Sequence, residues 1–198
     1  MIQRRFLGML LLSAGITFLT ACGQDKPSFK GVDITGVDYA QGWDLTDHNG
    51  QANTLKAFSG KAVVVCFGYT QCPDVCPTSL QELAEVKRLL GPDAERFQGI
   101  FITVDPDRDT TDLLKAYMAN FDPTFVALRP EPEQLSKVAK DFKIYFKKVE
   151  GKTPTSYTMD HSAGSFTFDP QGRVRLYNRY GIGASALADD VKLLLTSR

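Results

Sequence analysis

The sequence predicts an α/β fold in which helices connect parallel strands and antiparallel strands complete the sheet. Ala62–Phe67 and Phe97–Val104 are continuously apolar, as strands covered on both faces of a sheet are. Each precedes a segment with apolar residues at helical spacing, and this alternation is typical of a parallel βαβ unit. Ser165–Phe168 and Val174–Tyr177 alternate apolar and polar residues around a turn, which indicates an antiparallel hairpin.

Length and charge limit the class of protein. The 198 residues suit one domain of ordinary size with its own core. Lysine and arginine together number 23, as do aspartate and glutamate, so no basic field is available to bind a phosphate backbone. We therefore expect no nucleic-acid partner.

The first residues have the features of an export signal. Arg4 and Arg5 precede the apolar stretch 6–19, which is shorter than the roughly 20 apolar residues of a membrane span. The sequence Leu-Thr-Ala-Cys that ends at Cys22 resembles the lipobox of bacterial lipoproteins, in which the chain is cut before the cysteine and a diacylglycerol is attached to it. The alternatives are an uncleaved N-terminal helix and an ordinary signal peptide.

The lipobox interpretation divides the chain into three parts. Residues 1–21 form a lipoprotein signal peptide, residues 22–40 a membrane tether without regular periodicity, and residues 41–198 the folded domain. Cys22 is then the lipidation site. We expect the protein to be attached to a membrane of the bacterial cell envelope, with its domain facing the periplasm or the outer side.

The folded domain begins with a predicted β-hairpin. Trp43–Leu45 and Thr54–Lys56 flank a turn-rich segment that contains Asn-Gly, a strong hairpin signal. His48 lies in that turn, where a histidine is normally solvated, so we do not expect it to be a ligand.

The strand at 62–67 leads into a loop with two thiols. A proline and an aspartate follow Cys72 and favour a tight turn that brings Cys76 toward it. Pro77 suits the first position of the following helix, because proline lacks the N–H that a helix start leaves unpaired. The helix dipole favours thiolate over thiol there, so we expect Cys76 to be nucleophilic and a good metal ligand. Cys66, inside the apolar strand, is expected to be a small buried hydrophobic residue.

The remaining elements continue the alternation. An aspartate-rich turn at 105–110 follows the second apolar strand, and its carboxylates are expected to shape the turn and cap the next helix. The other predicted elements are a helix around 113–118, a short strand at 125–128, a helix at 133–142, an inserted hairpin with a basic side at 144–149 and 157–159, and a last helix around 187–195.

Together these elements predict a thioredoxin-like fold with an N-terminal β-hairpin and an inserted β-hairpin before the last two strands. Functional loops in such sheets lie at the carboxyl ends of the parallel strands. The start of the closing hairpin lies beside the thiol loop in this layout. We therefore expect His161 to face Cys72 and Cys76.

Three motifs in a fixed order carry a resemblance to a known family. They are Gly-Tyr-Thr-Gln-Cys-Pro-Asp-Val-Cys-Pro at 68–77, Val-Asp-Pro-Asp-Arg-Asp-Thr at 104–110, and Asp-His-Ser at 160–162 ahead of Asp-Pro-Gln-Gly at 169–172. The chain from about Gly42 to its C-terminus resembles the Sco/SenC/PrrC family. These thioredoxin-like copper proteins help assemble the binuclear copper centre of cytochrome c oxidase.

The resemblance implies a site and partners. Carried over by position, Cys72, Cys76 and His161 are the copper ligands. The implied partners are the copper-site subunit of cytochrome c oxidase and a thiol reductant protein. Many members of the family have an N-terminal transmembrane helix where this chain has a lipobox, so the mode of attachment differs and the site does not.

The chemistry of these residues agrees with a copper ion. Two thiolates and an imidazole are soft to borderline donors, which suit copper and disfavour magnesium or calcium. Structural zinc normally takes four protein ligands, and a set of three leaves a coordination position open for transfer.

Two other functions remain open at this point. In a thiol:disulfide oxidoreductase, Cys72 would attack a substrate disulfide and Cys76 would resolve the intermediate, or the two thiols would reduce the copper-site cysteines of the oxidase. In a lipoprotein of another role, the two cysteines would form a structural disulfide. Three residues separate the cysteines, unlike the two of the usual thioredoxin motif.

Overall fold

The computed structural model describes residues 28–153 and 156–196 and has the predicted thioredoxin-like α/β architecture. The predicted signal peptide and the predicted lipidation site Cys22 lie outside the described residues. Within the described part of the chain, none of the helices combines the length and the apolar character needed to cross a membrane.

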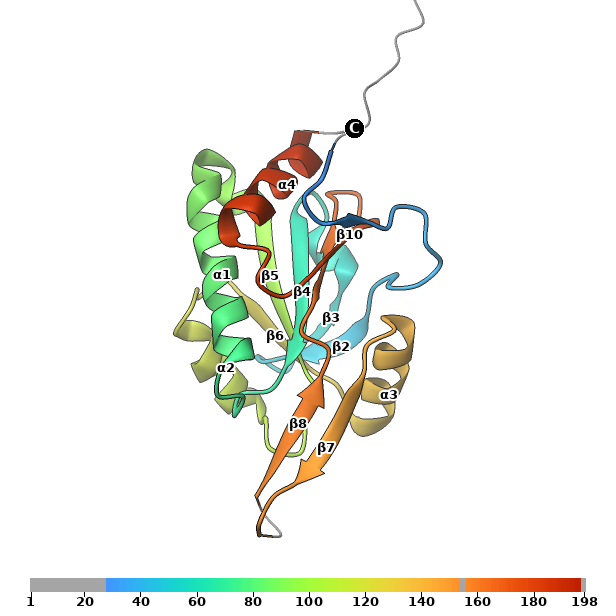
Figure 1. Ribbon diagram of the computed structural model, residues 1–198, viewed down its shortest axis with the longest axis vertical. Helices are drawn as coiled ribbons and strands as arrows, with labels where there is room; N and C mark the ends of the chain where they lie inside the picture. The colour runs from blue at the N-terminus through green and yellow to red at the C-terminus, as the bar shows by residue number, and fades with distance from the viewer. Residues whose placement is uncertain (1–27, 154–155, 197–198) are drawn as a thin grey trace, which may run out of the picture.

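A single eight-stranded sheet forms the centre of the domain (Figure 1). Its strand order is β1-β10-β9-β4-β5-β6-β2-β3, with β4, β5 and β6 parallel and the other neighbours antiparallel. The strands are β1 (Val32–Asp33), β2 (Asp44–Asp47), β3 (Ala52–Thr54), β4 (Ala62–Gly68), β5 (Phe97–Thr103), β6 (Val126–Arg129), β9 (Ser165–Phe168) and β10 (Val174–Asn178).

Helices cover both faces of this sheet. Figure 1 shows α1 and α4, which pack against each other, on one side and α3 on the other. The helices are α1 (Val75–Leu90), α2 (Thr111–Ala119), α3 (Pro132–Asp141) and α4 (Ala184–Thr196), with short 3₁₀ turns η1 (Leu55–Phe58) and η2 (Gly91–Arg96).

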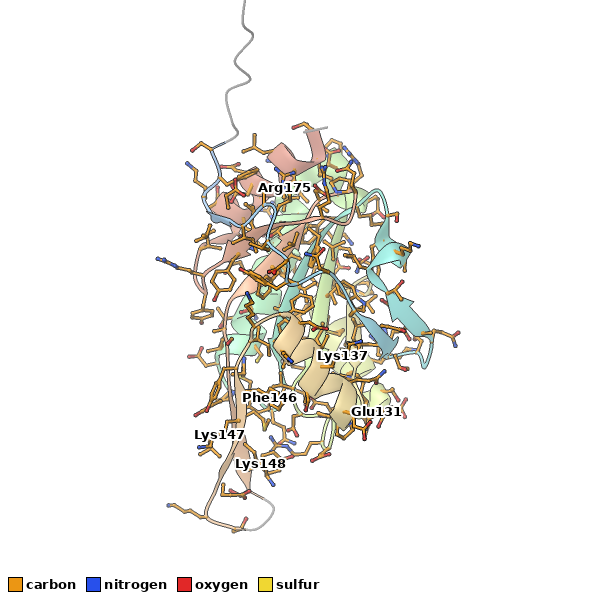
Figure 2. All side chains as sticks on the ribbon, turned by 90° about the vertical axis from the view of Figure 1, so that its right-hand side faces the viewer. Glu131, Lys137, Phe146, Lys147, Lys148 and Arg175 are labelled. Atoms are coloured by element: carbon orange, nitrogen blue, oxygen red, sulfur yellow. The ribbon has the colours of Figure 1, made fainter. Side chains whose placement is uncertain are left out.

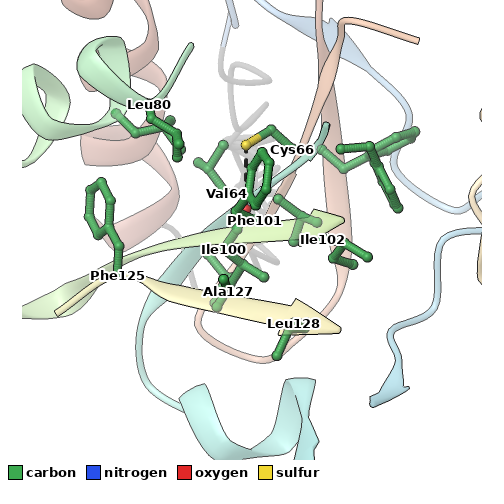
Figure 3. Close-up of a cluster of buried hydrophobic side chains, with 14 of the residues drawn as sticks. Val64, Cys66, Leu80, Ile100, Phe101, Ile102, Phe125, Ala127 and Leu128 are labelled. Atoms are coloured by element: carbon green, nitrogen blue, oxygen red, sulfur yellow. Dashed lines mark hydrogen bonds between the residues drawn. The ribbon is translucent and has the colours of Figure 1, made fainter. Parts of the chain in front are cut away.

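The two central strands explain why the sequence shows long apolar runs. Every residue of β4 and β5 is buried, because helices and neighbouring strands enclose both strands. Figure 3 shows Cys66 among these side chains, with its Sγ directed at the carbonyl oxygen of Ile100 at 3.5 Å. Burial raises the pKa of Cys66 to about 12, which keeps it a neutral thiol. The prediction that Cys66 serves packing is confirmed.

The sheet reaches into the segment that the sequence analysis assigned to the tether. Strand β1 pairs with β10, and Ala40 is fully buried. Asp190 on α4, itself fully buried, accepts backbone hydrogen bonds from Lys30 at 2.8 Å and from Gly31 at 2.7 Å. A buried carboxylate therefore holds the start of the described chain against the domain.

The N-terminal hairpin is present and extends the same sheet. Strand β2 pairs with β3 and also with β6. His48 is half-buried, and its Nδ1 accepts a hydrogen bond from the backbone N–H of Ala127 at 3.0 Å. The expectation of a simply solvated histidine was wrong, because the turn packs against the edge of β6.

The inserted hairpin forms a separate two-stranded sheet of β7 (Phe146–Glu150) and β8 (Tyr157–His161). It projects from the end of the domain opposite the end where the described chain begins (Figure 1). Phe146 is the register partner of His161. The base of the hairpin therefore carries the histidine that the sequence analysis singled out.

Candidate metal centre

The loop between β4 and α1 brings both thiols to one place. The backbone N–H of Cys72 donates to the carbonyl oxygen of Tyr69 at 3.2 Å, which closes a turn over residues 69–72, just before the turn predicted at Pro73 and Asp74. Helix α1 begins at Val75, two residues earlier than predicted, so Pro77 occupies the third helical position and Cys76 the second. The proline remains tolerable there because the first helical N–H groups have no partner within the helix.

Cys72, Cys76 and His161 converge as predicted. One ligand atom from each lies within 4.8 Å of the others. In the described part of the chain, these three residues form the group of at least three histidine, cysteine, aspartate or glutamate side chains that could hold a metal ion. The Sγ of Cys76 and the Nε2 of His161 are 3.4 Å apart. Cys76 is buried, whereas Cys72 and His161 are partly exposed, so a bound ion would be reachable from one side.

The backbone sets the orientation of the imidazole. Nδ1 of His161 lies 3.0 Å from the carbonyl oxygen of Ser162, which can only accept a hydrogen bond. In the neutral ring the proton therefore sits on Nδ1, and the lone pair of Nε2 points at the thiol of Cys76. The ring also packs edge-on against Tyr69, with 5.9 Å between ring centroids. Metal-ligating histidines are commonly oriented by such a bond from the second nitrogen.

Cys76 is a neutral thiol in the metal-free site, contrary to the expectation of a thiolate. Burial raises its pKa above the ordinary range, and a nearby ionised Cys72 would raise it further. Cys76 does lie at the start of a helix, whose dipole lowers the pKa of a thiol, but removal of the sulfur from water raises the pKa by more.

Gly68 makes room for the buried sulfur. A Cβ placed at this position would overlap the Sγ of Cys76 and would lie 2.8 Å from the ring of Phe101. The last residue of β4 must therefore lack a side chain for Cys76 to reach its place beside His161. No pattern in the sequence predicts this role of Gly68, because it depends on contacts with residues of α1 and β5.

A network around Arg108 joins the segments that carry the ligands. Its guanidinium donates to the carbonyl oxygen of Tyr157 on β8 at 2.9 Å and to Oε1 of Gln71 in the thiol loop at 3.2 Å, and it stacks 3.5 Å from the centre of the Tyr157 ring. Asp105 pairs with Arg108 and accepts from the hydroxyl of Tyr157 at 2.8 Å. Tyr157 and His161 lie on the same face of β8, so this clamp positions the strand that carries the histidine.

Asp109, at the end of this loop, also holds the thiol loop. Asp109 is buried and accepts from the backbone N–H of Thr70 at 3.1 Å and from its hydroxyl at 2.6 Å. The helix cap is supplied by Thr110, whose side chain accepts from the N–H of Leu113 at 3.2 Å. The expectation that the aspartates cap the helix was therefore wrong; the carboxylate of Asp109 connects this loop to the thiol loop, and that of Asp105 connects it to β8.

The donor set tests which metal the site fits. Two sulfur atoms and one imidazole nitrogen suit Cu(I), zinc or a related soft ion, and no carboxylate belongs to the group. Structural zinc sites normally close with four protein ligands, so three donors at a partly exposed place fit copper held for transfer better than a structural zinc.

The fold and the site together define a thioredoxin-like protein with a cysteine–cysteine–histidine metal site. The family model for SCO1/SenC matches residues 33–196. The chain therefore belongs to the SCO1/SenC family.

Individual relatives agree with this assignment. An SCO2-like protein of Rickettsia felis is 32% identical over 169 residues, which cover 83% of this chain and 82% of that protein. The structure of Bradyrhizobium japonicum ScoI with copper bound is 42% identical, with a TM-score of 0.71, and the match covers 77% of this chain and 97% of that one. BsSco, a member of the Sco family of cytochrome c oxidase assembly proteins, shares the fold at 22% identity and a TM-score of 0.64, over 81% and 95% of the two chains.

Proposed function

We propose that this protein binds one copper ion through the Sγ atoms of Cys72 and Cys76 and Nε2 of His161, and delivers it to the copper-site subunit of cytochrome c oxidase. The observation that supports this most directly is the convergence of the three donor atoms within 4.8 Å. The family membership and the copper-bound ScoI relative support the choice of metal. The oxidase assembly role of the Sco family supports the choice of acceptor.

The proposal includes an anchor and a reductant. Lipidation of Cys22 would hold the domain at a membrane of the bacterial cell envelope, facing the periplasm or the outer side. A thiol reductant protein is needed because a disulfide between Cys72 and Cys76 would remove both sulfur ligands. Mass spectrometry of the membrane-bound protein tests the anchor: a diacylglyceryl mass on Cys22 is expected, and an unmodified Cys22 would contradict it.

Metal titration tests the site. Cu(I) and Cu(II) are added separately to the reduced protein and to the protein oxidised at Cys72 and Cys76, and the stoichiometry and X-ray absorption ligand count are measured. We expect one copper with two sulfur ligands and proton release in the reduced form, and no tight binding in the oxidised form. Equal binding by the oxidised protein would show that the ligand set is wrong.

The histidine is tested against a matched control. His161→Ala removes the third ligand, so copper affinity should fall or the spectrum should change while the two thiols still form a disulfide. His48→Ala replaces the other of the two histidines, which contacts Ala127 and lies outside the cysteine group. Copper spectra that are identical in His161→Ala and the unsubstituted protein would contradict a role for His161.

The second candidate function is a thiol:disulfide oxidoreductase that does not transfer copper. It is favoured by the partial exposure of Cys72 next to a buried Cys76, which suits an attacking and a resolving thiol. The two thiols would give two electrons and two protons to a substrate disulfide and become a disulfide themselves. Turnover of a model disulfide by the copper-free protein at a rate near that of a true thioredoxin would favour this function over delivery.

A further inference from the structure

The residues before the N-terminal hairpin lie bound against the domain, and we call residues 30–40 the strap. At the start of the strap, the buried carboxylate of Asp190 accepts from the backbone N–H groups of Lys30 and Gly31, and β1 pairs with β10. The N–H of Ile34 then donates to the carbonyl oxygen of Arg175 on β10 at 2.9 Å. The first half of the strap is therefore bonded to both α4 and β10.

The second half of the strap is bonded to α3. The N–H of Ala40 donates to the carbonyl oxygen of Asp141, the last residue of α3, at 2.7 Å. Ala40 is fully buried and has a φ of 53°, which residues other than glycine seldom adopt. Just before it, the ring of Tyr39 lies under Nζ of Lys143, 4.0 Å from the ring centre. The strap is thus held at both of its ends.

The strap begins away from the metal site. Figure 2 shows Arg175, which binds the strap, near the end where the described chain begins, and Phe146 toward the hairpin end. Phe146 is the register partner of the predicted ligand His161. The inserted hairpin projects still further in that direction (Figure 1). The chain therefore leaves the domain toward Cys22 at one end, and the metal site lies toward the other.

Chain length determines whether the metal site could turn toward the membrane. Cys22 and Lys30 are eight residues apart, so the chain between them spans at most about 29 Å, and a flexible chain of this length has a root-mean-square reach of about 16 Å. A domain of this size has a radius of gyration of about 15 Å, which corresponds to a diameter of about 40 Å. Without the strap, the chain would be free as far as Asp44, the first residue of β2, and could span up to about 79 Å. Only the chain without the strap is long enough to pass along the whole domain.

We infer that the strap orients the membrane-anchored domain so that its metal site faces away from the lipid; this inference rests on the lipidation of Cys22 in the proposed function. The strap shortens the free chain to less than the diameter of the domain, so the end with the site cannot turn over to meet the membrane. The acceptor is then a protein whose own metal site stands clear of the lipid surface. A metal site level with the lipid headgroups would be out of reach.

Energy transfer from the metal site to the membrane tests this orientation. The full-length, lipidated, copper-free protein is reduced, added to preformed phosphatidylcholine vesicles and labelled with a maleimide donor dye. Cys72 takes the dye, because it is partly exposed, whereas Cys66 and Cys76 are buried and the sulfur of Cys22 carries the lipid. Acceptor dyes are attached to the lipid headgroups. The measurement uses no copper, so its outcome does not depend on whether the protein delivers the metal.

Three variants separate the strap from the free chain before it. Insertion of about 14 glycine and serine residues after Gly23 gives the free chain the length that it would have without the strap. The insertion lies outside the folded domain, so it decides the question even if a substitution in the domain is unstable. Asp190→Ala removes the acceptor that holds the start of the strap. The matched control, Asp189→Ala, removes an exposed carboxylate from the neighbouring position of α4.

We expect the insertion to raise the efficiency of energy transfer at least about twofold, because the site can then approach the lipid. Asp190→Ala should raise it by a smaller factor, and Asp189→Ala should leave it unchanged. Equal efficiencies in the unsubstituted protein and the insertion variant would overturn the inference. Equal efficiencies in Asp190→Ala and Asp189→Ala would also overturn it. If mass spectrometry of the same sample finds no lipid on Cys22, the anchor and this inference fall together, while copper delivery is still tested by metal titration.

Discussion

Replacement of Gly68 by alanine would show whether one missing side chain positions a metal ligand. The added methyl group would overlap the Sγ of Cys76 and would lie 2.8 Å from the Phe101 ring, whereas ordinary van der Waals contacts begin at 3.4 Å. Gly68 does not have a positive φ, so alanine fits the backbone and the effect comes from packing alone.

The structure sets the size of the expected effect. The sulfur of Cys76 must move by about 1 Å to relieve the overlap. Metal sites tolerate deviations of about 0.2 Å in ligand distance, so this shift should reduce copper affinity at least about tenfold, which corresponds to about 1.4 kcal/mol. Overpacking of the core should also lower the free energy of unfolding by about 1–3 kcal/mol.

A second glycine supplies the control. A Cβ at Gly99 on the neighbouring strand would lie 3.0 Å from the ring of Phe125, and Gly99 pairs with Val64, four residues before Gly68 on β4. Gly99→Ala should therefore destabilise the protein without changing its affinity for copper. The assays are competition of each variant with a chromogenic chelator for Cu(I), and urea unfolding. The reasoning would be refuted by unchanged affinity in Gly68→Ala or by an equal loss in both variants.

Three further predictions concern residues outside the ligand set. Arg108→Lys keeps the charge and loses the planar group that clamps β8, so copper affinity should fall about tenfold. Arg175→Lys changes another arginine that is paired with a buried carboxylate, and it should leave copper affinity unchanged. Equal copper affinities of the two variants would contradict the clamp. Burial lowers the pKa of His48 below 6.5, so the contribution of this residue to the free energy of unfolding is complete above that pH and is lost as the pH falls. Urea unfolding from about pH 7.5 to 5 should show this decrease in the free energy of unfolding, and an equal decrease in His48→Gln would contradict it. Asp190→Ala leaves two backbone N–H groups without their acceptor and should cost about 1–3 kcal/mol. Trypsin should then cleave after Lys30 faster than in the unsubstituted protein, and an unchanged cleavage rate would contradict the anchoring role.

The sequence was most informative where local patterns alone determine structure. The buried strands β4 and β5 and the amphipathic helix α1 have unambiguous periodicity, and all three were predicted within a few residues. Strand β1 has only two residues, both exposed, and such a strand has no periodic signal. Its place depends on pairing with β10 and on Asp190, which lies 160 residues from Lys30 in the sequence.

The convergence of the three side chains could be predicted because it follows from topology. A thioredoxin-like sheet brings the start of its closing hairpin beside the loop after the first parallel strand, whatever the loop sequences are. The clamp could not be predicted in this way, because Arg108 and Tyr157 are 49 residues apart and their contact depends on how the inserted hairpin folds back. Within the motif at 104–110, the sequence alone does not distinguish a charged residue that shapes a turn from one that joins two segments of the chain.

The protonation of Cys76 shows why position along a helix does not settle the state of a thiol. A helix N-terminus stabilises a negative charge by roughly 0.3–1 kcal/mol at exposed positions and by up to about 2 kcal/mol when partly buried. Transfer of an ion out of water costs several kcal/mol unless partners compensate for it. Cys76 is 3% exposed, and burial is the largest influence on its pKa, so desolvation outweighs the dipole and the thiol keeps its proton. The sequence can thus locate the sulfur at the helix start, while the depth of the site, set by Gly68 and the packing of β4 and β5, determines its charge.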